Sequence, residues 1–180
     1  IVVPLDAQST KKEIEYVIND CRPDIVFISD DKKEMFADMN LQNARLMTKD
    51  DVVLSDDKNI PATDIPLGNL EDVMLINYTS GTTGNPKGVM LTYKNVMFNI
   101  DSVSKQVPIS QEDSNVMVLL PLHHILPLLG SLVAPLYMGG TLHIAEAMNA
   151  ESIIKTLNAG KVSIIIGVPR LYDMLVKGIM

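Results

Sequence analysis

The residues best suited to chemistry lie between Tyr78 and Val89, in the run YTSGTTGNPKGV. This run combines three glycines, four Ser and Thr hydroxyls and one lysine, Lys87, and it follows an apolar stretch, Val73–Ile76, that predicts a buried strand. Glycine permits positive φ angles and close backbone approach, so successive N–H groups can converge on an anion, and hydroxyl and ammonium groups supply further donors. The composition therefore favours a loop that binds a polyphosphate.

Other phosphate-binding motifs fit this loop poorly. It is not a Walker motif, because Lys87 follows Asn85-Pro86 and is followed by Gly88 rather than by Ser or Thr. It is not the dinucleotide fingerprint either, since no G-x-G-x-x-G opens a helix here. A glycine-rich surface turn between two strands is the alternative. The absence of any acidic residue between Val73 and Ile100 favours an anion-binding role.

The run YTSGTTGNPKGV resembles the signature loop of the adenylate-forming enzymes, the superfamily of acyl-CoA synthetases, peptide-synthetase adenylation domains and luciferases. The resemblance implies that the loop holds the β- and γ-phosphates of ATP and then the departing pyrophosphate. It also implies a catalytic role for Lys87. The residues that it assigns to the phosphates are Thr79, Ser80, Gly81, Thr82, Thr83, Gly84 and Lys87.

A histidine pair, His123-His124, stands in the segment LPLHHI and resembles the second motif of acyl-CoA synthetases. Alignment on Pro121 puts the family histidine at His124. The resemblance implies a catalytic position between the α-phosphate and the acyl pocket, where a neutral imidazole could orient a carboxylate or a phosphate. The alternative is a core histidine bonded to a backbone carbonyl, which is the role we expect for His123 and His143.

A third segment, GVPRLY from Gly167 to Tyr172, resembles the VPR segment of long-chain acyl-CoA synthetases. In that family the segment lines the acyl channel. The resemblance therefore implies that Val168 and Pro169, together with His124, form the substrate pocket, and it favours a fatty acid over an amino acid. Without the resemblance, Pro169 would indicate only the start of a helix.

The resemblance implies a two-step reaction that uses ATP, Mg²⁺ and CoA. A carboxylate attacks the α-phosphorus of ATP to give an acyl-adenylate and pyrophosphate, and the CoA thiol then displaces AMP. The family's Thr-Glu pair, ribose-binding aspartate and adenylation lysine lie in later segments. We therefore expect an internal fragment of the N-terminal domain that is inactive by itself. Two alternatives remain. The first keeps the adenylation chemistry but transfers the acyl group to a carrier protein or uses another acid. The second is a non-catalytic phosphate-binding module.

Composition limits the partners and the compartment. A net charge of −7 without a Lys/Arg cluster argues against nucleic acid. The single cysteine, Cys21, excludes an intramolecular disulfide, fits a cytoplasmic location and is expected in the core. The three histidines and Cys21 lack the spacing of a zinc site.

The uncharged run Val116–Met138 is long enough to span a bilayer. Its prolines and histidines indicate a buried strand and helix instead, so membrane association is not indicated.

The pattern of elements predicts an α/β fold with a mostly parallel sheet flanked by helices, because apolar strands alternate with helices. The expected fold is a single α/β unit over 1–180, with a possible subdomain seam at 55–69. Because ligands bind beyond the carboxyl ends of parallel strands, the loop, the histidine pair and Gly167–Pro169 are expected at one sheet edge. The expected strands cover 1–5, 25–29, 73–76, 89–91, 116–120, 141–145 and 162–166. The first expected helix follows Thr10, whose spacing from Glu13 is that of a capping box. Another follows the cap Thr92 and turns Val96, Met97, Ile100 and Val103 inward. The other expected helices follow Asp30 and the histidine pair, cover 151–157 and begin near Pro169.

Overall fold

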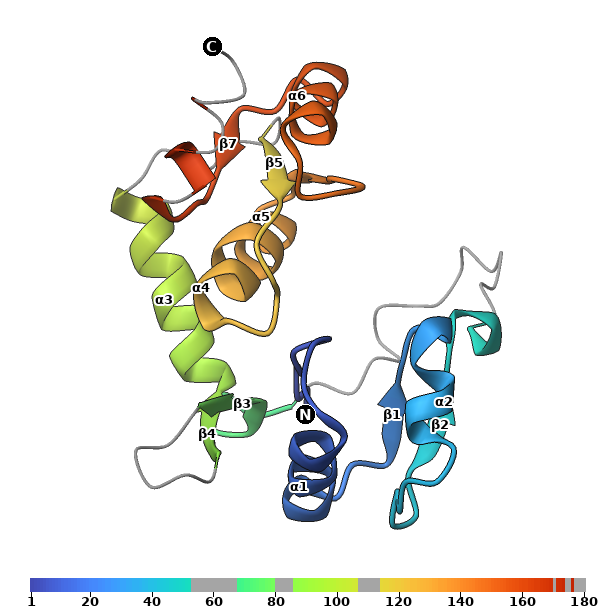
Figure 1. Cartoon of the computed structure of the whole chain (residues 1–180). Coiled ribbons are helices and arrows are strands. Elements are labelled where there is room, and N and C mark those ends of the chain that lie inside the picture. The colour runs from blue at the N-terminus through green and yellow to red at the C-terminus, as the bar shows by residue number, and fades with distance from the viewer. Residues whose placement is uncertain (53–67, 80–85, 107–113, 170, 174–175, 177–180) are drawn as a thin grey trace. The chain divides into compact units, whose positions relative to one another are not determined.

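The computed structural model describes residues 1–52, 68–79, 86–106, 114–169, 171–173 and 176 (Figure 1). The chain divides into two compact units, which are described separately. Unit 1 comprises Ile1–Pro4, Leu70–Asn77 and Val89–Met180, and unit 2 comprises Leu5–Asn69 and Tyr78–Gly88.

Unit 2 is a small α/β layer built on one pair of parallel strands. Strand β1 (Ile25–Phe27) pairs with β2 (Arg45–Met47), and the helices are α1 (Lys11–Cys21), η1 (Asp30–Lys32), α2 (Lys33–Phe36) and η2 (Lys49–Asp51). The core joins one face of α1 to β1 and α2, and it consists of Ile14, Ile18, Val26, Ile28, Phe36 and Met39.

Helix α1 begins at the capping box that the sequence predicts. The Thr10 backbone N–H donates to Glu13 Oε2 at 2.7 Å, and the Glu13 backbone N–H donates to Thr10 Oγ1 at 3.3 Å. These bonds satisfy two amides that the first helical turn leaves without partners. The helix ends at Cys21, and its C-cap residue Arg22 adopts a left-handed φ of 46° before Pro23. Cys21 is only half-buried, so the prediction that it lies in the core is wrong in part.

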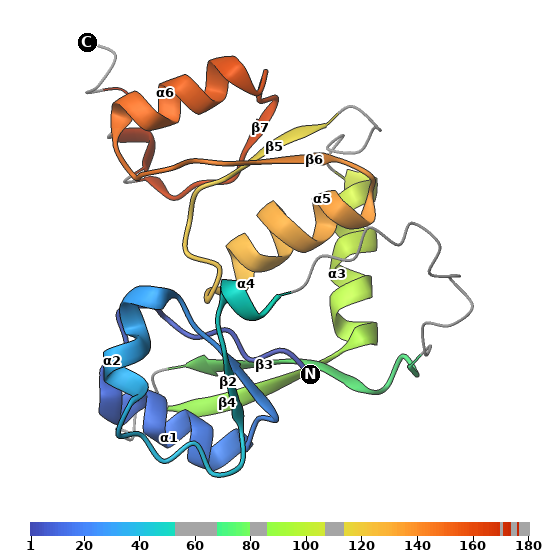
Figure 2. The ribbon, with the colours of Figure 1, turned by 90° about the vertical axis from the view of Figure 1, so that its right-hand side faces the viewer.

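Unit 1 is organised by a three-stranded parallel sheet of order β6-β5-β7. The central strand β5 (Asn115–Val118) pairs with β6 (Thr141–Ile144) and with β7 (Ile164–Ile165). Helix α6 (Ala150–Ala159) lies on one side of this sheet, and the helical segment after β5 lies on the other (Figure 2). Met117, Leu119, Ile153 and Leu171 form the core beneath α6.

The helical segment after β5 is continuous through α4 (Ile125–Pro127), η4 (Leu128–Val133) and α5 (Ala134–Tyr137). Its middle part, η4, is π-helical. Proline lacks an N–H, and its ring clashes with the carbonyl four residues earlier, so Pro135 accounts for the widened turn before it. Among the described residues, no helix is both long and apolar enough to cross a membrane.

The strands β3 (Val73–Thr79) and β4 (Lys87–Thr92) form a separate two-stranded sheet, and α3 (Tyr93–Gln106) follows directly. Asn95 N–H donates to Thr92 Oγ1 at 3.2 Å, which confirms the predicted cap. Val96 and Ile100 of α3 pack against Ala134. The contact between α3 and α5 is thus made by apolar side chains, and the helical spacing in the sequence predicts those of α3.

The α/β class and the parallel pairing are confirmed, with four differences in detail. The predicted strand at 1–5 is reduced to one bridge, Val2 to Leu75. Strand β2 was not predicted. Strand β4 begins at Lys87, which the sequence placed in the loop. The strands form three small sheets instead of one. Most of the predicted seam at 55–69 and part of the last helix lie outside the described residues, so the seam stays a prediction.

Candidate functional site

The two ends of the glycine-rich loop are Thr79, the last residue of β3, and Lys87, the first residue of β4. Only residues 80–86 connect these neighbouring strands, which is too short for a parallel crossover, so both ends lie at the same end of the strand pair. Both side chains are exposed, and Lys87 forms no ion pair with any residue that the structure describes. The other predicted phosphate ligands, Ser80, Gly81, Thr82, Thr83 and Gly84, lie outside the described residues.

Tyr78 links the start of this loop to the end of α1. Its hydroxyl donates to Asp20 Oδ2 at 2.6 Å. Partial burial of the hydroxyl and, to a smaller extent, this bond to a carboxylate raise the pKa of Tyr78 above its ordinary value of 10.0. Burial also raises the pKa of the neighbouring Cys21 thiol. The hydroxyl of Tyr78 therefore stays protonated and keeps donating throughout the physiological pH range.

Asn77, two residues before Thr79, contacts the histidine segment. Its side chain is only 8% exposed, and its Nδ2 donates to the backbone carbonyl of His123 at 3.3 Å. This bond fixes the turn between β5 and α4 against β3. His124 immediately follows this turn as the residue before α4, and its side chain is exposed. The rings of His123 and His124 lie 4.0 Å apart between centroids, at 50°.

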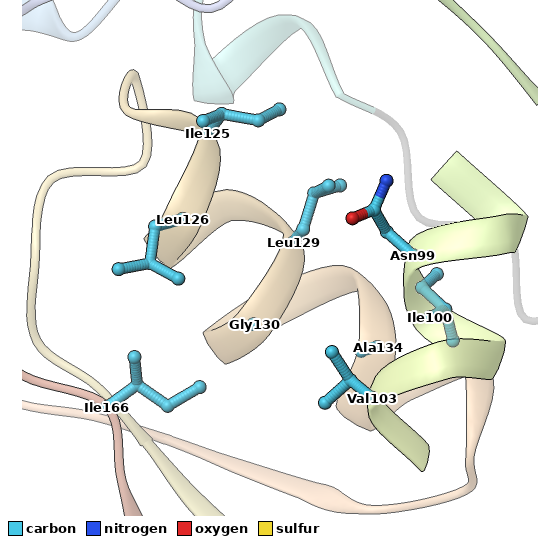
Figure 3. A pocket seen from close by; sticks show the side chains of 9 residues that line it. All are labelled: Asn99, Ile100, Val103, Ile125, Leu126, Leu129, Gly130, Ala134 and Ile166. Carbon is cyan, nitrogen blue, oxygen red and sulfur yellow. The ribbon is translucent and has the colours of Figure 1, made fainter. Parts of the chain in front are cut away.

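A cavity of about 270 Å³ lies beside the segment that follows His124 (Figure 3). Ile125 and Leu126 of α4 line it, which places its wall directly after the predicted catalytic histidine. Asn99 supplies the one polar side chain among the described lining residues, and its Nδ2 already donates to the Asn95 carbonyl at 2.9 Å. The remaining wall is aliphatic or glycine and consists of Ile100, Val103, Leu129, Gly130, Ala134 and Ile166.

The carboxyl ends of β5 and β7 come together, as the sequence predicts for the histidine pair and Gly167–Pro169, because the two strands are parallel neighbours. The glycine-rich loop follows β3 of a separate sheet, so its place at this edge stays a prediction. Ile166 follows β7 and lines the cavity together with Ile125, which follows the histidine pair. Val168 and Pro169 are exposed and do not line this cavity, although they lie only two and three residues after Ile166. His124 does not line it either.

The sequence did not predict most of the cavity wall. Ile100 and Val103 were expected on the inner face of α3, but Leu129, Gly130 and Ile166 were not singled out. One signal was present, because a glycine inside an uncharged helical run marks a place where another chain segment can approach closely. Among the described residues, no group of three or more His, Cys, Asp or Glu side chains could hold a metal ion.

Comparison with known proteins identifies the class that this fold and loop define. The chain matches the AMP-binding enzyme family over residues 1–179, and it belongs to that family. The feruloyl-CoA synthase of Amycolatopsis sp is 27% identical over 175 residues, which cover 97% of this chain and 35% of that protein. Long-chain-fatty-acid–CoA ligase 1 of Schizosaccharomyces pombe is 35% identical over 115 residues, which cover 61% of this chain and 17% of that protein.

A solved structure shows that the fold of this chain is also similar to that of a known protein. The crystal structure of ATP-bound MatB from Rhodopseudomonas palustris has a TM-score of 0.77 and 27% sequence identity, and the match covers 98% of this chain and 36% of that chain. The chain thus has the architecture of a part of these acyl-CoA synthetases. It spans about a third of the length of the feruloyl-CoA synthase and of MatB.

Proposed function

We propose that this chain is part of an AMP-forming acid–thiol ligase, which activates a carboxylic acid as an acyl-adenylate and transfers the acyl group to CoA. The observation that carries the proposal is the signature loop between β3 and β4 in a chain that matches the AMP-binding enzyme family over residues 1–179. The ATP-bound state of MatB supports ATP as the substrate. The names of two relatives, a feruloyl-CoA synthase and a long-chain-fatty-acid–CoA ligase, support CoA as the acceptor.

In this proposal, the loop and Lys87 bind the β- and γ-phosphates of ATP. Attack of a carboxylate on the α-phosphorus brings one anion onto another, so catalysis depends on positioning and on neutralising charge. An exposed lysine that forms no ion pair with a described residue is available for this role. The proposed phosphate ligands are the seven residues named above, from Thr79 to Lys87.

His124 is proposed to hold the carboxylate end of the acid. Two observations support this role. The bond from Asn77 to the His123 carbonyl fixes the turn between β5 and α4. Ile125 and Leu126, which follow His124 directly, line the cavity. A carboxylate held at His124 would therefore place its apolar part beside the cavity. Val168 and Pro169 are proposed to contribute to the same substrate pocket, since they follow Ile166 closely.

A fatty acid is the proposed substrate class. The cavity wall is almost wholly aliphatic, and its one polar side chain, Asn99, is engaged with its own helix. An aromatic acid with ring hydroxyls, or a dicarboxylic acid, would find only the Oδ1 of Asn99 as a side-chain polar partner among the described lining residues. The similarity to the S. pombe fatty-acid ligase supports this substrate class, whereas the similarity to the feruloyl-CoA synthase would support an aromatic acid instead.

Magnesium and a cytoplasmic location are also part of the proposal. The described residues offer no ligand cluster for a metal, so the proposed Mg²⁺ requires ligands from elsewhere or from the phosphates of ATP. A single cysteine fits a reducing compartment, and we propose the cytoplasm.

The test is ATP–pyrophosphate exchange by the full-length protein with fatty, aromatic, dicarboxylic and amino acids. Exchange driven by fatty acids, followed by acyl-CoA formation when CoA is added, is the expected result. Exchange with another acid would keep the adenylation chemistry and overturn the substrate class. Transfer to a carrier protein but not to CoA would overturn the acceptor. Exchange with none of these acids would contradict the ligase and favour a non-catalytic phosphate-binding module.

A further inference from the structure

His124 is fixed through its backbone and not through its side chain. Its N–H donates to the Pro121 carbonyl at 3.3 Å, and its own carbonyl accepts from the Leu128 N–H at 3.1 Å. It is the N-cap residue of α4, but its side chain makes no capping bond. The imidazole is exposed and forms no hydrogen bond or ion pair with any residue that the structure describes. Such a side chain can rotate about both of its torsion angles, so packing has to define the position of its ring.

The ring of His123 packs against the ring of His124. The two ring centroids lie 4.0 Å apart, and the ring planes are tilted by 50°. Atoms of two imidazoles at this separation are in van der Waals contact. His123 is half-buried, and its backbone carbonyl accepts the bond from Asn77 at 3.3 Å. A residue anchored to β3 therefore borders one side of the exposed imidazole.

We propose that His123 is a positioning residue, whose ring restricts the rotation of His124 and holds its imidazole where the carboxylate of the acid binds. This inference rests on the proposed function, because it requires that the acid binds at His124, but it does not depend on the class of acid. A side chain that already has its bound position loses less conformational entropy when the substrate binds. His123 acts through His124, and no contact with the substrate is assigned to it.

The test is ATP–pyrophosphate exchange by the full-length protein with the acid that the wild type uses best. His123→Ala removes the supporting ring and should lower kcat/KM for the acid by about 10-fold, because His124 is then misplaced. KM for ATP should stay near the wild-type value. His123→Phe keeps a ring without either nitrogen and should restore most of the activity. His143→Ala is the control, because it removes a half-buried imidazole of β6 that is bonded to Asn115 at 2.8 Å, and it should leave kcat/KM for the acid unchanged.

A double-mutant cycle separates an action through His124 from an independent effect of His123. His124→Ala alone should lower kcat/KM for the acid more than His123→Ala does. The double variant should be no more impaired than His124→Ala alone, because the supporting ring then has nothing left to position. Additive losses would contradict the inference, since they would assign His123 a separate role in stability or binding.

Modification of His124 by diethyl pyrocarbonate gives a readout that does not depend on activity. The reagent acylates exposed imidazoles, and mass spectrometry of the full-length protein locates the modified residue. Modification of His124 should be faster in His123→Ala than in the wild type, because one side of the ring is uncovered. His123→Phe should match the wild type. Equal rates in all three proteins would show that the His123 ring does not restrict His124.

The outcomes separate this inference from the proposed function. Absence of exchange with every acid in the wild type overturns both. Undiminished exchange in His124→Ala overturns the role of His124 together with this inference, and it leaves the ligase intact. Impaired exchange in His124→Ala with wild-type kinetics in His123→Ala overturns this inference alone. Failure of His123→Phe to restore activity, at a wild-type thermal midpoint, also overturns it, since ring packing would then not be what His123 supplies.

Discussion

Asn77 Nδ2 donates a hydrogen bond to the backbone carbonyl of His123 at 3.3 Å, so a buried side chain at the end of β3 holds the turn that precedes α4. The contact connects the strand before the glycine-rich loop to the histidine segment, although the two are 46 residues apart in the sequence. Asn77 therefore holds the turn that immediately precedes His124.

Asn77→Ala is expected to destabilise the protein and to impair use of the acid. Loss of the amide leaves a carbonyl without its partner, at a cost of about 1–3 kcal/mol. The thermal midpoint of the full-length protein should fall, and kcat/KM for the acid should fall more than that for ATP. Asn158→Ala, at an exposed position of α6, is the control. Equal losses for the acid and ATP would contradict the positioning role.

Lys87→Ala is expected to lower adenylation by about 10-fold to 1,000-fold, because a charge at the developing pyrophosphate would be lost. Thermal unfolding should be unchanged, since the side chain is exposed. ATP–pyrophosphate exchange measures the effect. Lys105→Ala is the control, because Lys105 is an exposed lysine paired with Asp101 at 2.6 Å on α3. An unchanged exchange rate in Lys87→Ala would remove this lysine from the mechanism.

Tyr78→Phe is expected to weaken the link between α1 and the phosphate-binding loop. The variant loses the bond to Asp20, and because the contact is largely exposed the free energy of unfolding should fall by about 1 kcal/mol or less. KM for ATP should rise, because the loop begins at the next residue. Asp20→Asn, which keeps an acceptor oxygen, should have the smaller effect. An ATP KM equal to the wild type in both variants would contradict a role in placing the loop.

The hydrogen bond between Tyr78 and Asp20 also predicts that the stability of the protein depends on pH under alkaline conditions. The pKa of Tyr78 is raised in the folded state, so its stabilising contribution is fully present below the unfolded value of 10.0. It is lost as the pH rises through the folded-state pKa. Thermal midpoints at about pH 8 and about pH 11 should therefore differ more for the wild type than for Tyr78→Phe. Parallel curves for the two proteins would contradict this assignment.

Ser131→Ala is expected to stabilise the protein. The Ser131 hydroxyl is fully buried in η4 and has no hydrogen-bond partner among the residues that the structure describes. Removing an unpaired buried hydroxyl should raise the free energy of unfolding by about 1 kcal/mol. Ser102→Ala is the control, because the Ser102 hydroxyl donates to the Phe98 carbonyl at 2.7 Å on an exposed helix face. A lower thermal midpoint in Ser131→Ala would show that the hydroxyl has a stabilising partner.

The sequence by itself determined the features that depend on neighbouring residues. The capping box of Thr10 and Glu13, the cap at Thr92 and the apolar runs of β3 and β5 are confirmed, because each arises from hydrogen bonds or periodicity within a few residues. The signature loop could also be recognised from the sequence, since its glycines, hydroxyls and lysine lie within twelve residues, from Tyr78 to Val89. Its role as a phosphate-binding site stays a prediction.

Only the tertiary structure decided the features that depend on distant residues. Strand β2 is three residues long and exists because it pairs with β1. The bond from Asn77 to His123 and the approach of Ile166 to Gly130 each join separate elements. No local pattern specifies such contacts, because they follow from the order of strands in the sheet and from how helices pack on it. The glycine-rich loop could therefore be found in the sequence, whereas the shape of the cavity beside α4 could be found only in the fold.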